Sequence, residues 1–304
     1  MRHVRLGVLD VGSNTTRLLV ADLKRGEIAP VAKVKVRLSL GEEIERSGEV
    51  SKAHVAAAAK AVERLADLAR DERAEALDVF LTAPGRQADN AEQLVSALTR
   101  AAGVPVRVLS TEEEGRLAYS GAVATSRVPL PGTVAVCDVG GASTEIAVGA
   151  PHAAPSWIES VDLGSVRLTT RVLDGGRPSG GELARAQAEA ARAFASVVPP
   201  EVEAALAVGG SARAARRLVG GTLGEDELRE AVRLVRSHSP RTIARRFGVD
   251  RERARILAGG LVLLVEVQAR LGVPLHVCDG GIREGALLAW AEESQGVAVS
   301  RRTA

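Results

Sequence analysis

Two stretches of the chain share one pattern: Asp10-Val11-Gly12-Ser13-Asn14-Thr15-Thr16-Arg17-Leu18-Leu19-Val20 and Asp138-Val139-Gly140-Gly141-Ala142-Ser143-Thr144-Glu145-Ile146-Ala147-Val148. At matching steps both have Asp, Val, Gly, a hydroxyl residue, Thr, an aliphatic residue and Val. Each stretch follows an apolar run, so each predicts a strand, a tight glycine turn and a returning strand. Glycine lets the backbone approach a ligand closely, and successive N–H groups in such a turn form an anion-binding nest.

The repetition favours a paired phosphate site over two ordinary hairpins. One Asp-Gly segment commonly supplies only turn geometry, but two copies in register indicate shared chemistry. Two such turns facing each other would clamp a phosphate chain, and the aspartates at the strand ends could hold its metal ion. The turn residues expected to bind phosphate are Gly12, Ser13, Asn14, Thr15, Gly140, Gly141, Ala142 and Ser143.

Composition sets limits on fold and partners. A chain of 304 residues predicts two domains. With 46% hydrophobic but only 2% aromatic residues, the cores must be built from Ala, Val and Leu. The net charge of +2, from 40 basic and 38 acidic residues, disfavours a nucleic-acid coat protein. The longest apolar run, 256–265, is too short to cross a bilayer, so no membrane partner is expected.

Cysteine and histidine usage predicts neither disulfides nor a metal centre. Cys137 and Cys278 each precede an Asp-containing glycine turn, and buried reduced thiols are favoured over a disulfide. The histidines show no ligand spacing and are interpreted as surface or core residues: His3, His54, His152, His238 and His276. Strand sequence begins at the N-terminus without a signal peptide, so a cytoplasmic protein is expected.

Hydrophobic periodicity predicts a similar succession of strands and helices in each half of the chain. In the first half strands are expected at 4–11, 17–23, 29–36, 76–82 and 104–109, and helices at 51–69, 90–102 and from 111. In the second half strands are expected at 133–137, 143–149, 157–163, 205–208 and 275–278, and helices at 180–197, from 209, and at 225–237, 240–247, 250–271 and from 283. Strand–helix alternation predicts an α/β fold of two related domains, 1–122 and 123–304. The last helix, 283–304, could pack back on the first domain.

Further motifs, taken in order, resemble the exopolyphosphatase / guanosine pentaphosphate phosphohydrolase (Ppx/GppA) family of the actin, heat-shock chaperone and sugar kinase superfamily. They are Leu81-Thr82-Ala83-Pro84-Gly85-Arg86-Gln87-Ala88-Asp89-Asn90, Glu113-Glu114-Gly115-Arg116-Leu117-Ala118-Tyr119, Gly164-Ser165-Val166-Arg167-Leu168-Thr169, Gly209-Gly210-Ser211 and Asp279-Gly280-Gly281-Ile282-Arg283-Glu284-Gly285. With the paired turns, they cover nearly the whole chain. The resemblance implies two actin-like (RNase H-like) domains with a cleft between them.

The resemblance also implies a reaction. It is release of terminal phosphate from inorganic polyphosphate, or of the 5′ γ-phosphate of guanosine pentaphosphate, with Mg²⁺ (or Mn²⁺). The second Glu of the family's Glu-Glu motif falls on Glu114, the implied general base. Asp138 and Glu145 are the implied metal ligands, with Asp10 as a third acid. The arginine guanidinium suits phosphate oxygens. Arg86 and Arg283 are the first candidates to bind phosphate, and Arg17 and Arg37 are second candidates. Gly209, Gly210 and Ser211 are a further expected anion contact.

The sequence departs from the family pattern at a few positions. Ala142 replaces a third glycine, but its N–H remains, so the nest is expected to survive. Ala83, Pro84, Thr111 and Gly115 also differ from the usual residues. The chain ends soon after the final helix, which suggests shorter polyphosphates or nucleotides as substrates. A homodimer is compatible with the sequence.

Three alternatives remain open at this stage. Thr111-x-x-Glu114 fits a helix capping box, and local sequence alone favours that role for Glu114. The segment 241–257 resembles a helix-turn-helix, which would make the protein a ligand-sensing DNA-binding regulator. Its would-be recognition helix carries Glu252 and runs into an apolar segment, which disfavours nucleic acid as a partner. A sugar or acid kinase of the same superfamily is the third.

Overall fold

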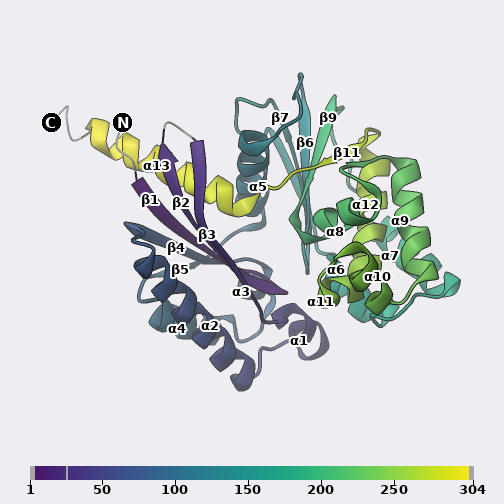
Figure 1. Ribbon diagram of the computed structural model, residues 1–304, viewed down its shortest axis with the longest axis horizontal. Helices are drawn as coiled ribbons and strands as arrows, with labels where there is room; N and C mark the ends of the chain where they lie inside the picture. The colour runs from purple at the N-terminus through teal and green to yellow at the C-terminus, as the bar shows by residue number, and fades with distance from the viewer. Residues whose placement is uncertain (1–3, 25–26, 301–304) are drawn as a thin grey trace. The chain divides into compact units, whose positions relative to one another are not determined.

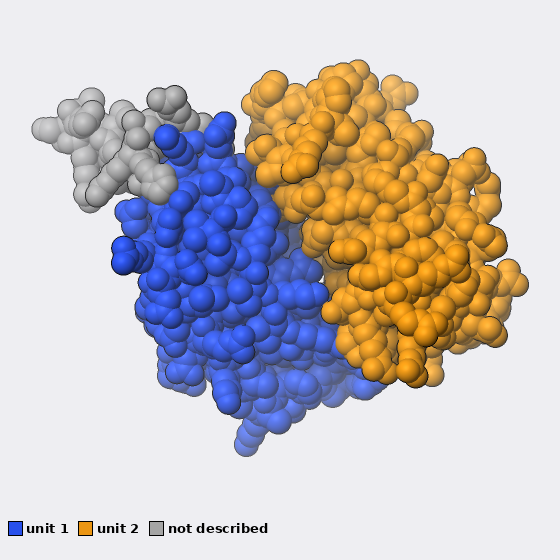
Figure 2. Space-filling view, in the orientation of Figure 1, with its two compact units in different colours: residues 1–121, 282–304 blue, residues 122–281 orange. Residues whose placement is uncertain are grey.

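The chain folds into two compact units. The computed structural model describes residues 4–24 and 27–300. His3, the start of the expected first domain (1–3) and the end of the expected second domain (301–304) therefore lie outside the described residues. Unit 1 comprises residues 1–121 and 282–304, and unit 2 comprises residues 122–281; Figure 2 colours them blue and orange. The chain leaves unit 1 within one helix and returns to it just before the last helix.

Unit 1 is built on a five-stranded sheet with strand order β3-β2-β1-β4-β5. Its elements are β1 (Val4–Val11), β2 (Thr15–Lys24), β3 (Glu27–Arg37), α1 (Leu40–Ser47), α2 (Lys52–Asp71), β4 (Ala76–Leu81), α3 (Ala83–Gln87), α4 (Ala91–Ala102), β5 (Val106–Val108), most of α5 (Thr111–Thr125) and α13 (Ile282–Ser300). β1 pairs antiparallel with β2 and parallel with β4. Helix α13 packs on β1 and β2 (Figure 1).

The two faces of this sheet follow from strand alternation, because successive side chains point to opposite faces. On β2, Leu18 and Val20 join the core that α2 and α4 cover. Leu19 and Ala21 join a second cluster, which contains Leu287 of α13. The sheet is therefore buried on both faces by helices from distant parts of the chain.

Unit 2 is built on a six-stranded sheet with strand order β10-β11-β9-β6-β7-β8. Its elements are β6 (Val134–Val139), β7 (Thr144–Gly149), β8 (Trp157–Val161), α6 (Ser165–Leu168), the π-helical turn η1 (Thr169–Leu173), α7 (Gly180–Ala193), β9 (Ala204–Val208), α8 (Gly209–Val219), β10 (Thr222–Leu223), α9 (Glu225–Ser237), α10 (Pro240–Phe247), α11 (Arg251–Arg255), α12 (Leu257–Leu271) and β11 (Leu275–Val277). β11, β9 and β6 run parallel. One core of mainly Ala, Val and Leu fills the unit, as composition predicts.

The structure confirms the mixed α/β class and corrects several boundaries. The single helix expected at 250–271 is wrong, because Ile256 leaves the helical conformation and separates α11 from α12. The break lets α12 lie close to α6 and α8, where Gly259 and Gly260 approach Ser165 and Ser211. Helices α1, α3 and α6 are short, and periodicity does not identify them. None of the described helices has the length and apolar character needed to cross a bilayer.

Candidate functional site

In unit 1, three predicted motifs meet at one edge of the sheet. Leu81 at the end of β4 pairs with Val11 on one side and Val108 on the other. The Thr82 N–H donates to the Val11 carbonyl at 3.3 Å, and the Leu109 N–H donates to the Leu81 carbonyl at 2.9 Å. The turn after β1, the start of α3 and the start of α5 are therefore neighbours. The carboxyl ends of parallel strands are where α/β sheets bind ligands.

The turn between β1 and β2 is closed by a hydrogen bond from the Gly12 N–H to the Thr15 carbonyl at 3.1 Å. The Ser13 carbonyl accepts from the Gly41 N–H at 2.7 Å, and the Asn14 carbonyl accepts from the segment before α1. Within the described residues, the N–H groups of Ser13 and Asn14 donate no hydrogen bond. The turn thus keeps the donors that an anion nest requires.

Glu114, the predicted base, lies in the first turn of α5 and is mostly buried. Its Oε2 is 2.5 Å from Nη2 of Arg86. Nη1 of the same guanidinium donates to the Leu109 carbonyl at 2.6 Å. Arg86 is therefore fixed between β5 and α5, and in this structure it holds a carboxylate.

The capping role considered for Glu114 is wrong. The capping box is formed one residue earlier, by Ser110 and Glu113. The Ser110 N–H donates to Oε2 of Glu113 at 2.8 Å, and the Glu113 N–H donates to Oγ of Ser110 at 3.1 Å. The hydrogen bond from the Ser110 backbone is the main cause that lowers the pKa of Glu113; burial opposes it. Because Thr111 already begins the helix, Glu113 takes the capping position and Glu114 is left for another role.

Thr82 is a neighbour of the Gly12 turn to which sequence reasoning assigned no role. A Cβ placed on Gly12 would lie 3.7 Å from both Thr82 Oγ1 and Asp10 Oδ1. Both side chains are buried. Asp10 itself lies opposite Arg17 on β2. The Gly12 turn is thus bordered by an acid, a hydroxyl and a base.

In unit 2, the turn between β6 and β7 repeats this geometry. The Gly140 N–H donates to the Ser143 carbonyl at 3.0 Å. The carbonyls of Gly140 and Gly141 accept from the N–H groups of Ser165 and Val166 at 2.9 and 2.8 Å. In the part of the chain that the structure describes, the Gly141 and Ala142 N–H groups donate no hydrogen bond. With alanine at 142 the turn therefore keeps the same arrangement of N–H donors as the first turn.

The Gly209-Gly210-Ser211 turn lies beside this hairpin, because β9 is the parallel neighbour of β6. A Cβ on Gly209 would lie 2.2 Å from Asp138 Oδ1, so the carboxylate rests directly against that glycine. Ser211 Oγ donates to the Val139 carbonyl at 3.3 Å. The structure brings together the unit 2 residues that the sequence predicts.

Asp138 and Glu145 are opposite each other in the β6–β7 register. Glu145 is buried, and Ser160 Oγ donates to its Oε1 at 3.0 Å. Like charges directly opposite on neighbouring strands repel, so the pair suits a cation. The described residues contain no group of three or more His, Cys, Asp or Glu that could hold a metal. Mg²⁺ usually takes one or two carboxylates and completes its shell with phosphates and water, so the pair fits that ion. Asp10, the third predicted ligand, belongs to unit 1.

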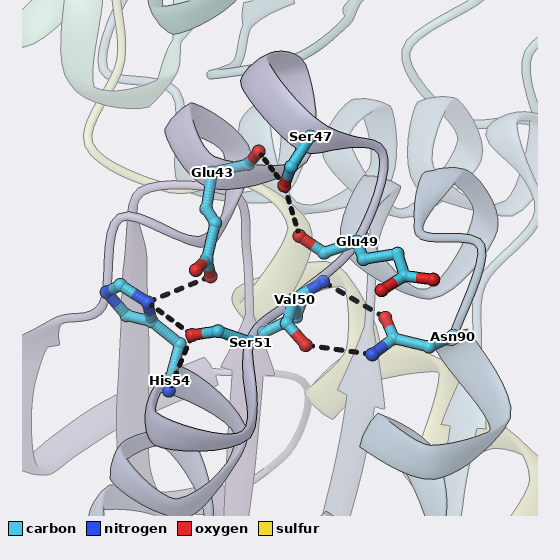
Figure 3. A network of polar contacts seen from close by, with 7 residues as sticks. All are labelled: Glu43, Ser47, Glu49, Val50, Ser51, His54 and Asn90. Atoms are coloured by element: carbon cyan, nitrogen blue, oxygen red, sulfur yellow. Dashed lines mark hydrogen bonds and ion pairs between the residues drawn. The ribbon is translucent and has the colours of Figure 1, made fainter.

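Two further residues of the predicted motifs, Arg283 and Asn90, are not among the contacts described above. Arg283 is the second residue of α13, in unit 1 and half-buried. Asn90 forms a structural contact: its side chain accepts from the Val50 N–H at 3.0 Å and donates to the Val50 carbonyl at 2.8 Å (Figure 3). In the same network, Glu43 of α1 contacts Nδ1 of His54 at 2.8 Å. Asn90 thus fastens the segment between α1 and α2 to the start of α4.

The segment 241–257 does not form the recognition helix expected of a helix-turn-helix. Helix α11 has only 5 residues, and α12, which follows it, is buried along Leu257–Leu264. A Cβ on Gly210 would lie 2.5 Å from Nη2 of Arg253, so that guanidinium covers the glycine turn. The segment therefore contributes a cation to the unit 2 site, which no feature of the sequence pattern indicates.

Comparisons with known proteins agree with this geometry. A sequence model of the Ppx/GppA phosphatase family matches residues 19–294. Exopolyphosphatase 1 of Mycobacterium tuberculosis is 31% identical over 303 residues, covering 94% of this chain and 88% of its own length. The Mycobacterium leprae protein of the same name is 29% identical over 94% of this chain and 89% of its own.

Solved structures share the fold. A Ppx/GppA family member from Aquifex aeolicus superposes with a TM-score of 0.81 at 22% identity, over 96% of this chain and 99% of that one. An exopolyphosphatase from Cytophaga hutchinsonii gives a TM-score of 0.82 at 17% identity, over 95% and 98%. These matches confirm the predicted pair of actin-like domains. Because the family match extends over residues 19–294, which include the second glycine hairpin and Glu114, the chain belongs to the Ppx/GppA phosphatase family and is a phosphoanhydride hydrolase.

Proposed function

We propose that the protein is an exopolyphosphatase that releases terminal orthophosphate from inorganic polyphosphate, with Glu114 as the general base. The observation that carries the proposal is the division of roles between adjacent acids. Glu113 caps α5, whereas the mostly buried Glu114 carboxylate is held by Arg86 at the edge where the Gly12 turn lies. The names of the mycobacterial relatives support the choice of substrate.

In the proposed reaction, Glu114 accepts a proton from a water molecule as the water oxygen attacks the terminal phosphorus. The bond from that phosphorus to the bridging oxygen breaks, and the shortened chain leaves with the bridging oxygen. One water is consumed and one orthophosphate is released. Phosphoryl transfer depends mainly on positioning and charge neutralisation. The N–H groups of the two turns, Thr82 and the arginines would supply the phosphate contacts.

The proposal includes Mg²⁺ (or Mn²⁺) held by Asp138 and Glu145, with Asp10 as a further acid. When bound, such an ion neutralises charge on phosphate oxygens. The directly opposed pair of acids supports this assignment. Arg86 has a positioning role here, because its contacts with the Leu109 carbonyl and Glu114 fix the orientation of the base.

The adjacent glutamates provide the decisive test. Glu114→Gln should lower kcat for phosphate release by about 10²–10⁴-fold, because the amide cannot accept the proton. Glu113→Gln is the matched control, one residue away and on the capping box, and should keep kcat within about twofold while slightly lowering stability. Equal activity of the two variants would remove Glu114 from the mechanism.

Substrate choice is a separate measurement. Phosphate release from short polyphosphate, long polyphosphate and guanosine pentaphosphate should be compared side by side with the same enzyme preparation. We expect a higher kcat/KM with polyphosphate. A higher kcat/KM with guanosine pentaphosphate would establish the alternative substrate, and ATP-dependent phosphorylation of an added small molecule would instead indicate a kinase.

A further inference from the structure

Four basic residues form a strip across two strands of unit 1, beside the Gly12 turn. The basic strip consists of Lys33, Lys35 and Arg37 on β3 and Arg17 on β2. Alternate residues of a strand share one face, so the three residues of β3 point to the same side. Arg17 is directly opposite Lys35 in the register and therefore shares that side.

Neighbouring residues identify the face. Lys33 is opposite Leu19, which packs in the cluster that contains Leu287 of α13. Nζ of Lys33 is also 3.8 Å from Oε1 of Glu284, in the first turn of α13. The basic strip thus lies on the side of the sheet that α13 covers, on the edge strand β3, where its lysines remain exposed to solvent.

The strip begins at the phosphate-binding turn and leads away from it. Arg37 is opposite Thr15, the last residue of the turn, and Nε of Arg17 donates to Oγ1 of Thr15 at 3.1 Å. Lys35 and Lys33 follow on the same face, with successive Cα atoms about 6.8 Å apart. The positive charges are therefore spaced along a line that starts where a terminal phosphate would bind.

Protection of an edge strand accounts for only part of this pattern. Lysines on an edge strand discourage pairing with other chains. This accounts for the presence of Lys33 and Lys35 on β3. It does not explain why Arg17, on an interior strand, is directly opposite Lys35. Like charges at directly opposed positions are destabilising. Asp10 on β1 is opposite Arg17 and offsets part of this repulsion, and an anion bound across β2 and β3 would offset it further.

We propose that the basic strip binds the phosphates that follow the terminal phosphate of an anionic chain, so that Lys33 and Lys35 favour long polyphosphate over short. This rests on the proposed function, since it extends the same substrate along unit 1. Glu284, beside Lys33, limits the charge at the far end of the strip. Long chains contact the whole strip, whereas the shortest reach only its start.

The experiment compares three double variants on two substrates, tripolyphosphate and long-chain polyphosphate. Lys33→Ser/Lys35→Ser removes both charges, Lys33→Arg/Lys35→Arg keeps them, and Lys52→Ser/Lys60→Ser removes two exposed lysines of α2 as the control. Initial rates give KM at several salt concentrations. Binding of long-chain polyphosphate is measured separately by calorimetry with the same variants made in the Glu114→Gln background, so that turnover is suppressed.

Removal of both strip lysines should raise KM and the dissociation constant for long-chain polyphosphate roughly fivefold, with a smaller change for tripolyphosphate. Their dependence on salt should also become weaker, because fewer ion contacts form. The arginine variant and the α2 control should match the wild type. Unchanged binding of the long chain by the strip variant would overturn the inference. If the wild type hydrolyses neither polymer, the proposed function fails, and the calorimetry still decides whether the strip binds the chain.

Discussion

The two glycine hairpins share one backbone turn and differ in the charges around it. In the first, Asp10 is opposite Arg17; in the second, Asp138 is opposite Glu145. The turns close with equivalent hydrogen bonds, at 3.1 Å in the first and 3.0 Å in the second. Both turns keep N–H groups suited to an anion, and one residue on the returning strand gives only the second turn a pair of opposed acids suited to a cation. This comparison suggests how a repeated element can take two roles in one reaction.

Each hairpin turn also packs against a glycine at the start of a helix, and the two backbones approach each other closely. A Cβ on Gly41 would lie 2.7 Å from Cβ of Ser13, and a Cβ on Gly164 would lie 2.4 Å from the carbonyl carbon of Gly141. Ser13 and Gly141 occupy equivalent places in the two turns. The support for the turn is therefore repeated together with the turn.

The largest expected effect follows from this support. Gly164→Ala should lower the free energy of unfolding by about 3–5 kcal/mol, because its methyl group meets backbone that has no room to move. Gly41→Ala should lower it by about 1–3 kcal/mol, since the methyl group meets a side-chain atom. Denaturant unfolding measures both. Gly176→Ala, with nothing within 4 Å, is the control. Equal stability of all three variants would show that the turns do not depend on these contacts.

The charge difference can be tested by removing one residue from each hairpin. Glu145→Gln should weaken Mg²⁺ binding about 10–100-fold, measured by calorimetry or by the Mg²⁺ dependence of Tm. Arg17→Gln should leave Mg²⁺ binding close to normal and raise KM for polyphosphate about tenfold. If both variants lost metal affinity equally, the assignment of the cation to the acidic pair of the second hairpin would be wrong.

Equivalent threonines give a smaller contrast. Both Thr16 and Thr144 are fully buried. Thr144 Oγ1 donates to the Leu163 carbonyl at 2.8 Å, whereas Thr16 Oγ1 has no hydrogen-bond partner among the described residues. Thr144→Val should therefore lower the free energy of unfolding by about 1–2 kcal/mol, and Thr16→Val should leave it unchanged or raise it. Thermal unfolding in the same buffer would distinguish them, and a larger loss for Thr16→Val would contradict the comparison.

The smallest effect concerns the pH dependence of the α5 cap. The folded-state pKa of Glu113 is lowered, so its stabilising contribution is complete above the pKa of the unfolded chain. It is lost as pH falls through the folded-state pKa. The stability difference between wild type and Glu113→Gln, a few tenths to about 1 kcal/mol at pH 7, should shrink as pH falls below about 5. A difference that grows in acid would contradict the capping role.

The hairpins could be predicted because their signal is local. Asp, Gly and Thr at fixed steps specify a turn, and the second copy makes the interpretation firm. The supporting glycines Gly41 and Gly164 could not be predicted, because each is separated in sequence from the turn that it contacts. Each follows a leucine, and a Leu-Gly pair alone is a weak signal. Their requirement arises only when two distant backbones come within contact distance.

The site around Glu114 shows a similar limit. Both Ser110-x-x-Glu113 and Thr111-x-x-Glu114 fit a capping box, and the residue at which β5 ends decides between them. The ion pair of Arg86 and Glu114 depends on β4 and β5 being neighbours in the sheet. Sequence motifs identified the participants, but only tertiary structure could pair them.

The two cysteines allow the unfolding of unit 2 to be followed by thiol chemistry. Cys137 and Cys278 are the only thiols of the chain, both lie in unit 2, and both are buried and unpaired with each other. Burial raises the pKa of Cys137, so little reactive thiolate exists while the sheet is closed. The alkylation rate of Cys137 would consequently follow exposure of the unit 2 sheet, and would separate the unfolding of unit 2 from that of the cysteine-free unit 1.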